Sequence, residues 1–214
     1  MQCFMSNIKT LAITIDRLCL KRALRTLTNP ISLTILPGAA LLVNGMNGVG
    51  KTTFLRTLAG LINTPEGSIL CNQVPINICI DEYLQLITYC GHNLPMKEFM
   101  TVEENLLIWA AIYNHELCLE AALHCFDLTS KRHMLVKNLS QGWKQRLKLS
   151  RLLLSSAKIW LLDEPVANLD HNGTKLVEQL INSHTARGNI AIIATNNEMN
   201  LQRAVHFNLN EMAI

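Results

Sequence analysis

The stretch Gly45-Met46-Asn47-Gly48-Val49-Gly50-Lys51-Thr52 decides the fold expected for this chain of 214 residues. It fits the pattern G-x-x-x-x-G-K-S/T, in which glycines let the backbone curl so that successive N–H groups point at phosphate oxygens. Lys51 is expected on the β- and γ-phosphates of a nucleotide, and the Thr52 hydroxyl on Mg²⁺. The candidate phosphate-binding residues are Gly45, Met46, Asn47, Gly48, Val49, Gly50, Lys51, Thr52 and Thr53.

The segments on either side of this loop have the order that a phosphate-binding turn requires. An apolar run at residues 39–43 predicts a buried strand, and residues 54–59 predict a helix. A helix that starts at the loop presents its positive N-terminus to the bound anion. An ordinary glycine turn would also fit the loop alone, but it would not need a strand before it and a helix after it.

A second apolar run, at residues 159–162, ends in the two carboxylates Asp163 and Glu164. Asp163 is expected to hold Mg²⁺ directly or through water. Glu164 follows one step later, where a group that orients or deprotonates water belongs. Two acids that merely end a strand at the surface are the alternative, and the phosphate loop makes that alternative less plausible.

The remaining pattern alternates strands with helices, which predicts an α/β fold with a mostly parallel sheet. Thr101 and Glu104 form a predicted capping box before an apolar run. The length predicts a single domain over residues 1–214, with a mostly helical block at about 93–156. Further strands are expected at residues 8–15, 31–35, 67–70, 86–89 and 189–195, and helices at residues 101–126, 145–154 and 171–187.

Composition excludes several classes of protein. Charged residues make up 16% and hydrophobic residues 49%, which argues against disorder, and a net charge of +3 is too small to indicate a nucleic-acid partner. The longest apolar run, residues 106–113, is far below the roughly 20 residues of a membrane-spanning helix, and the first residues lack the pattern of a signal peptide. The seven cysteines are scattered without a C-x-x-C pair, which favours reduced core thiols and a reducing compartment.

A third motif carries a family resemblance. Residues 139–143, Leu-Ser-Gln-Gly-Trp, resemble the L-S-x-G-Q signature of ATP-binding cassette (ABC) ATPases, and residues 167–170 resemble the D-loop of that family. The resemblance covers essentially the whole chain. It implies a P-loop NTPase fold with a mostly parallel core sheet, an N-terminal antiparallel β subdomain and a helical signature subdomain.

The same resemblance implies a homodimer of two ATPase subunits that sandwich two ATP molecules with Mg²⁺. Ser140 and Gly142 would then contact the γ-phosphate bound on the opposite subunit. A hydroxyl, a bare backbone and a helix N-terminus are suitable anion ligands. For Ser140, a plain helix N-cap is the alternative.

The stretch from Tyr89 to Leu106 is similar to one subfamily, the ATP-binding subunits of cytochrome c maturation heme exporters. The matching positions include residues 89–92, Lys97 and residues 101–106. This resemblance implies ATP hydrolysis coupled to export of heme or a related substrate. It also implies a peripheral subunit at the cytoplasmic face of a bacterial inner membrane, or an organellar equivalent, bound to an integral CcmB-like permease that a CcmC-like protein can accompany, with no nucleic-acid partner.

Several positions depart from the pattern of most ABC ATPases. His92 stands where glutamine is usual and is a candidate catalytic residue, with a strand-end residue as the alternative. Trp143 replaces the signature glutamine and packs either at the subunit interface or within the helical block. Asn196 follows the last predicted core strand, where the family has a histidine (the switch histidine) beside the γ-phosphate. Because the asparagine amide cannot carry a proton near pH 7, slow hydrolysis is expected. Residues 20–23 offer no aromatic ring to stack on adenine.

Other functions remain open at this point. The chain could serve another small exporter, such as one for lipid or lipoprotein release, or act as a nucleotide-binding scaffold without turnover, which Asn196 favours. Members of the family that act on ribosomes carry two cassettes in one chain, and DNA-repair members need long coiled coils. Neither feature occurs in these 214 residues.

Overall fold

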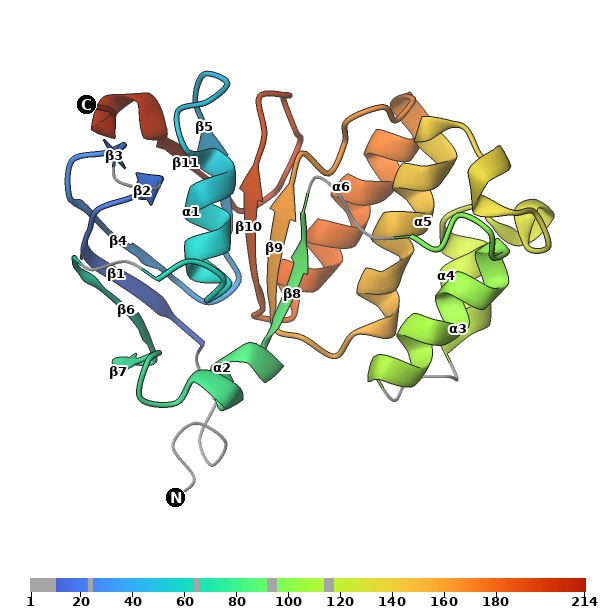
Figure 1. Cartoon of the computed structure of the whole chain (residues 1–214), viewed down its shortest axis with the longest axis horizontal. Coiled ribbons are helices and arrows are strands. Elements are labelled where there is room, and N and C mark those ends of the chain that lie inside the picture. The colour runs from blue at the N-terminus through green and yellow to red at the C-terminus, as the bar shows by residue number, and fades with distance from the viewer. Residues whose placement is uncertain (1–10, 23–24, 64–65, 92–95, 114–117) are drawn as a thin grey trace. The chain divides into compact units, whose positions relative to one another are not determined.

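The computed structural model describes residues 11–22, 25–63, 66–91, 96–113 and 118–214. They divide into two compact units (Figure 1). The first unit takes its described residues from the part of the chain up to Gly91, from Ala157–Glu164 and from Ile181–Ile214. The second unit takes them from His92–Ser156 and from Pro165–Leu180. The long helix α6 (His171–Ala186) begins in the second unit and ends in the first.

A five-stranded parallel sheet forms the centre of the first unit, with strand order β11-β5-β10-β9-β8. Every residue of β9 and β10 is buried, as expected for central strands of a parallel sheet that is covered on both faces. The α/β fold class predicted from the sequence is therefore confirmed. The five strands are β5 (Ala40–Asn44), β8 (Ile87–Cys90), β9 (Ile159–Asp163), β10 (Ile190–Ala194) and β11 (Ala204–Asn208).

Helix α1 (Lys51–Leu58) follows β5 and packs against β9 and β10. Phe54 and Leu55 on this helix are fully buried in the core of the unit. Gly50 precedes the helix with a φ of 119°, a conformation that side-chain-bearing residues rarely adopt. The glycine is therefore required for the chain to turn from the loop into the helix.

The second sheet of this unit is antiparallel, with strand order β4-β1-β6-β7. The predicted strand at residues 8–15 was partly wrong, because β1 runs from Ile13 to Leu18, and residues 8–10 lie outside the described residues. A bulge with Arg17 at a φ of 47° turns Leu18 back toward the core, which extends the strand. The other elements here are β4 (Ile31–Ile35), β6 (Ser68–Cys71), β7 (Val74–Pro75), and the separate pair β2 (Lys21–Arg22) and β3 (Arg25–Thr26).

Several elements of the first unit were not predicted from the sequence, and strand β11 and the short helix after β7 are two of them. Edge strand β11 is only partly buried and has His206 at its centre, so it shows no apolar run. Helix α2 (Ile80–Gln85) is six residues long, and it places Tyr83 in the core, where the phenol donates to Leu58 O over 2.8 Å. That bond satisfies a carbonyl at the end of α1, and the short helix thus closes the C-terminus of the helix that starts at the phosphate loop.

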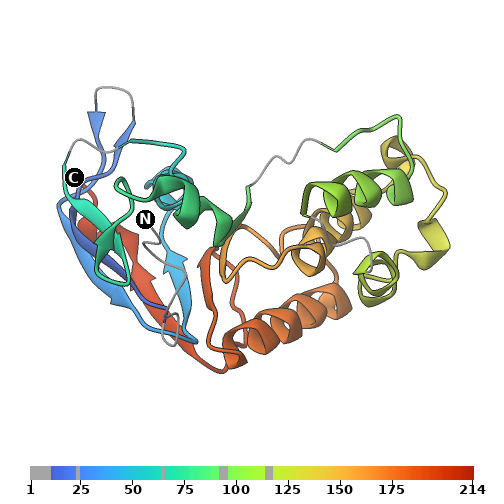
Figure 2. The same cartoon turned by 90° about the horizontal axis from the view of Figure 1, so that it is seen from below.

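The helical unit contains α3 (Val102–Tyr113), α4 (Leu119–Cys125) and α5 (Gln141–Leu154), with α5 packed against the other two (Figure 2). The predicted capping box is confirmed, because the Thr101 N–H donates to Glu104 Oε2 over 2.7 Å and the Glu104 N–H donates to Thr101 Oγ1 over 3.2 Å. The prediction of a single helix over residues 101–126 was wrong, because two helices, α3 and α4, lie in this range. Each packs its own buried face on α5.

Six cysteines lie among the described residues, and all six are free thiols. Four of them are buried, as expected for core thiols, whereas Cys125 is exposed at the end of α4. In the part of the chain that the structure describes, no helix has the length and apolar character to cross a membrane.

One buried titratable group makes a testable contribution to stability. His184 on α6 stacks on Trp160 with ring centroids 3.6 Å apart, and burial lowers the pKa of His184 to about 4. An unfolded chain takes up a proton on histidine below about pH 6.5, while the folded one does not until about pH 4. The contribution of the neutral, buried His184 to the free energy of unfolding is therefore complete above about pH 6.5. As the pH falls from there to about 4, the free energy of unfolding decreases by about 3 kcal/mol.

We expect His184→Phe to reduce this loss of stability between pH 6.5 and pH 4, because phenylalanine can keep the ring stacking but cannot take up a proton. Urea denaturation of the wild type and the variant at pH 7 and pH 5 measures the effect. Parallel pH profiles for the two proteins would contradict the assignment.

Candidate functional site

The phosphate loop joins β5 to α1 at the carboxyl end of the parallel sheet. Lys51 is buried, and its ammonium donates to the carbonyl oxygens of Gly45 and Met46 and to Asn196 Oδ1, the last over 3.0 Å. A Cβ on Gly45 would lie 2.9 Å from Val49 Cγ1, so the tight curl of the loop needs a bare backbone there. The loop is thus folded around the Lys51 ammonium.

The Thr52 hydroxyl donates to Asp163 Oδ2 over 2.8 Å. Asp163 is only 2% exposed at the end of β9, and Thr52 sits in the first turn of α1. The structure therefore brings together the two residues that the sequence assigned to Mg²⁺. An oxygen-only pair suits this ion, which uses one or two carboxylates and completes its coordination with waters and phosphate oxygens.

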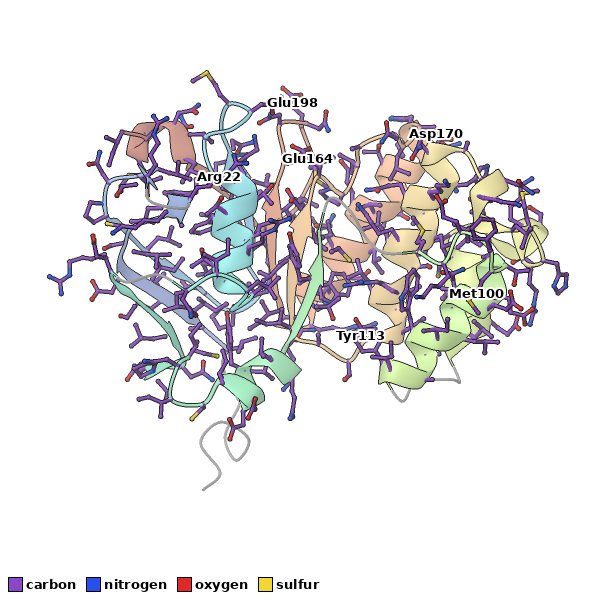
Figure 3. The ribbon with its side chains drawn as sticks, viewed as in Figure 1. Arg22, Met100, Tyr113, Glu164, Asp170 and Glu198 are labelled. Carbon is purple, nitrogen blue, oxygen red and sulfur yellow. The ribbon has the colours of Figure 1, made fainter. Side chains whose placement is uncertain are left out.

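Glu164 directly follows β9 (Figure 3) and has a φ of 49°. Its N–H donates to Ala194 O over 2.8 Å. Its Oε2 accepts a hydrogen bond of 3.2 Å from the Thr195 hydroxyl, and that hydroxyl in turn accepts one from the Asn197 N–H. Thr195 is fully buried and was missed by the sequence analysis. This threonine anchors the Glu164 carboxylate beside the end of β10.

Asn196 comes directly after Thr195 and is joined to two residues of the phosphate loop. Its Oδ1 accepts from the Lys51 ammonium, and its Nδ2 donates to Asn47 Oδ1, each over 3.0 Å. Within this unit the structure therefore brings Asn196, Lys51, Thr52, Asp163 and Glu164 to one end of the parallel sheet. Thr53 lies on α1, half-buried, and Met46, Asn47 and Gly48 are exposed. His92, the other predicted catalytic residue, lies outside the described residues.

The signature residues lie in the helical unit, around a pocket of about 260 Å³. Ser140 is the N-cap of α5, and its Oγ accepts from the Trp143 N–H over 3.4 Å. A Cβ on Gly142 would lie 2.9 Å from Asn168 O, so this glycine allows the D-loop backbone to approach. Trp143 is half-buried with the Arg146 guanidinium over its ring at 5.0 Å, which is packing inside the helical unit.

Two neighbouring polar residues of α5 hold the chain that follows Glu164. Gln145 Nε2 donates to Pro165 O over 2.7 Å, and Arg146 donates to Asp127 over 2.7 Å and to Asp170 over 3.0 Å. The Gly173 N–H and then Arg146 hold the pKa of Asp170 below its ordinary value. Sequence reasoning missed both residues, although a polar pair within the buried face of a predicted helix was a signal.

Comparisons with known proteins show the family to which this chain belongs. The ABC transporter family matches residues 28–167, and the chain belongs to that family. The chain is therefore an ABC-type transport ATPase, and its fold is that of this family. A Pyrococcus furiosus protein described as an ABC transporter ATP-binding protein has a similar structure, with a TM-score of 0.82 and 26% identity over 95% of this chain and 100% of that one. A bacterial Atm1-family ABC exporter with ATP bound shares the fold, with a TM-score of 0.77 and 19% identity over 89% of this chain and 35% of that one.

Relatives found by sequence indicate which kind of ABC transporter subunit this chain is similar to. The chain is 39% identical to the cytochrome c biogenesis ATP-binding export protein CcmA of Pseudomonas aeruginosa, over 85% of this chain and 91% of that protein. It is 36% identical to the CcmA of Albidiferax ferrireducens, over 92% of this chain and 94% of that protein.

Proposed function

We propose that this chain is the ATP-hydrolysing subunit of a membrane exporter in cytochrome c biogenesis, with heme or a related substrate as its cargo. The relatives named CcmA, at 36–39% identity over most of both chains, support the pathway. One observation in the structure carries the chemistry. Lys51, Thr52 and Asp163 converge where a phosphate loop needs a cation and a metal-binding pair, and Glu164 follows in the chain.

In this proposal each residue has a distinct role. When ATP binds, the Lys51 ammonium donates to the β- and γ-phosphates in place of the Gly45 and Met46 carbonyl oxygens, while backbone N–H groups of residues 45–53 bind phosphate oxygens. Thr52 and Asp163 hold Mg²⁺, which supplies neutralisation of phosphate charge. Glu164, positioned by Thr195, orients the attacking water or takes its proton.

The proposal also includes an ATP-bound homodimer. In it Ser140 and Gly142 contact the γ-phosphate bound on the opposite subunit, whereas His92 and Asn196 complete the polar surroundings of the γ-phosphate bound at the loop of their own subunit. Residues 1–214 act as one ATP-binding domain with a helical subdomain at about 93–156. The subunit lies at the cytoplasmic face of the membrane on a CcmB-like permease, with a CcmC-like protein as a further member.

The experiment is co-expression of the chain with a CcmB-like permease, followed by co-purification from membranes and heme staining of c-type cytochromes in a host that lacks its own CcmA. Wild type should co-purify and restore heme-stained cytochromes. A chain that neither binds the permease nor restores staining, while folded and ATP-binding, would contradict the heme-export proposal in favour of another small exporter.

A weakly hydrolysing regulatory subunit is the second candidate function. One observation favours it: the Asn196 amide joins Lys51 to Asn47 at the position where a histidine was expected. A neutral hydrogen bond contributes about 0.5–1.5 kcal/mol, against about 1.5–3 kcal/mol with a charged partner. The stabilisation lost by having a neutral asparagine in place of a charged histidine is larger in the transition state, where charge develops on the phosphate.

We therefore expect Asn196→His to raise turnover on the order of tenfold, with ATP affinity changed by less than about threefold. Phosphate release at saturating ATP, with the membrane partner present, measures the first quantity, and calorimetric titration measures the second. A histidine variant that is no faster, in a protein whose activity Glu164→Gln abolishes, would show that Asn196 does not limit hydrolysis.

A further inference from the structure

An asparagine far along the chain is bound to the first peptide group of the phosphate loop. Strand β11 pairs with β5 in parallel, with Asn208 opposite Asn44, so the chain that follows β11 emerges beside the loop that follows β5. That chain is the short helix η4 (Leu209–Met212). Its Asn210 accepts a hydrogen bond of 2.9 Å at Oδ1 from the Met46 N–H, across 164 positions of sequence.

The same peptide group contacts Lys51 through its other end. Gly45 O accepts from the Lys51 ammonium, while the N–H of the same Gly45–Met46 peptide donates to Asn210. A peptide group is planar, so fixing its N–H also fixes the direction of its carbonyl oxygen. Asn210 thus sets the orientation of a carbonyl that holds the lysine.

Local packing supports a defined position for Asn210. The Asn210 N–H donates to Asn208 Oδ1 over 3.2 Å, and Asn208 Nδ2 donates to Glu211 Oε1 over 3.1 Å. A Cβ on Gly45 would lie 3.3 Å from Asn210 Oδ1, so the bare glycine leaves room for the amide. Leu209, next to it, is fully buried and anchors the turn.

We propose that Asn210 is a positioning residue of the phosphate loop, whose side-chain oxygen fixes the Gly45–Met46 peptide and through it the Lys51 ammonium. The proposal rests on ATP binding at this loop, which is part of the proposed function. Asn210 lies beyond residues 28–167, the part that the family match covers. Its contribution to nucleotide binding comes through the loop and not through contact with the nucleotide.

The test has two readouts on the full-length chain: the Kd for MgATP by calorimetry, and hydrogen exchange of the Met46 amide by NMR without nucleotide. Asn210→Ala should raise the Kd about threefold to tenfold, the effect of one neutral hydrogen bond, and should speed up exchange of the Met46 amide. Glu211→Gln, in the same turn, keeps an oxygen acceptor for Asn208 and should change neither quantity. A merely structural role would lower the number of binding sites per chain and leave the Kd of the folded fraction unchanged.

A conservative variant completes the experiment. Asn210→Asp keeps an oxygen acceptor, so the Met46 amide should stay as protected as in the wild type, and this variant decides the question if Asn210→Ala does not fold. An unchanged Kd and unchanged Met46 exchange in Asn210→Ala, or loss of protection in Asn210→Asp, would overturn the proposal. Failure of the wild type to bind ATP would count against the proposed function instead, because the exchange readout needs no nucleotide.

Discussion

Glu164→Gln is expected to hydrolyse ATP about a hundred- to ten-thousandfold more slowly than the wild type, the usual loss when a general base is removed. Glutamine keeps the shape of the side chain and an oxygen that can accept from the Thr195 hydroxyl, which is 3.2 Å from Glu164 Oε2. The variant therefore loses the proton acceptor and not the fold. The variant should still bind ATP but hydrolyse it only slowly. Since hydrolysis is the step that separates the two subunits, the variant should accumulate as an ATP-bound dimer.

Size-exclusion chromatography with light scattering, in ATP and Mg²⁺, detects this dimer, and phosphate release measures the rate. Glu198→Gln is the matched control, because it makes the same change at an exposed glutamate in the loop after β10 (Figure 3). The control should behave as the wild type. A Glu164→Gln protein that stays monomeric and hydrolyses ATP like the wild type would argue against both the role of Glu164 and the ATP sandwich.

Lys51→Ala is expected to weaken ATP binding about ten- to a hundredfold, since one charge-assisted contact contributes roughly 1.5–3 kcal/mol. Lys51 is buried within the loop, and its ammonium is the cation that the loop backbone and Asn196 surround. The substitution therefore removes both the charge offered to phosphate and the group around which the loop folds. Turnover should become undetectable.

Calorimetric titration with MgATP measures the loss, and circular dichroism checks that the variant is folded. Lys137→Ala removes a lysine from the helical unit, where its ammonium lies over the Phe99 ring, and should leave the affinity unchanged. Wild-type affinity in a folded Lys51→Ala protein would mean that residues 45–52 are not the nucleotide site.

The parts of the fold that the sequence predicts are those with local signals. The loop at residues 45–52, the buried runs of β9 and β10 and the capping box at Thr101 each consist of neighbouring residues whose types fix the local conformation. Strand β11 has no such signal, because only its hydrogen bonds to β5 make it a strand. The bulge at Arg17 likewise follows from the pairing of β1 with β4, not from the residues of β1 alone.

The same distinction holds for the site. Lys51, Thr52, Asp163 and Glu164 belong to motifs whose spacing can be read in the sequence. The residues that hold these groups in place could not be predicted, because each acts across a long stretch of chain. Thr195 reaches Glu164 across 31 positions and Asn210 reaches Met46 across 164. Only the parallel order of the strands brings these polar side chains together.

The central claim is that the loop at residues 45–53 binds the phosphates of ATP, with Thr52 and Asp163 beside it. The most direct test is two-dimensional amide NMR of the full chain during titration with MgATP. The amides of residues 45–53 and of Asp163 are predicted to shift together and to saturate, and the same titration of Lys51→Ala should not reach saturation. Saturable shifts confined to other parts of the protein, or none at millimolar ATP with a folded chain, would contradict the account.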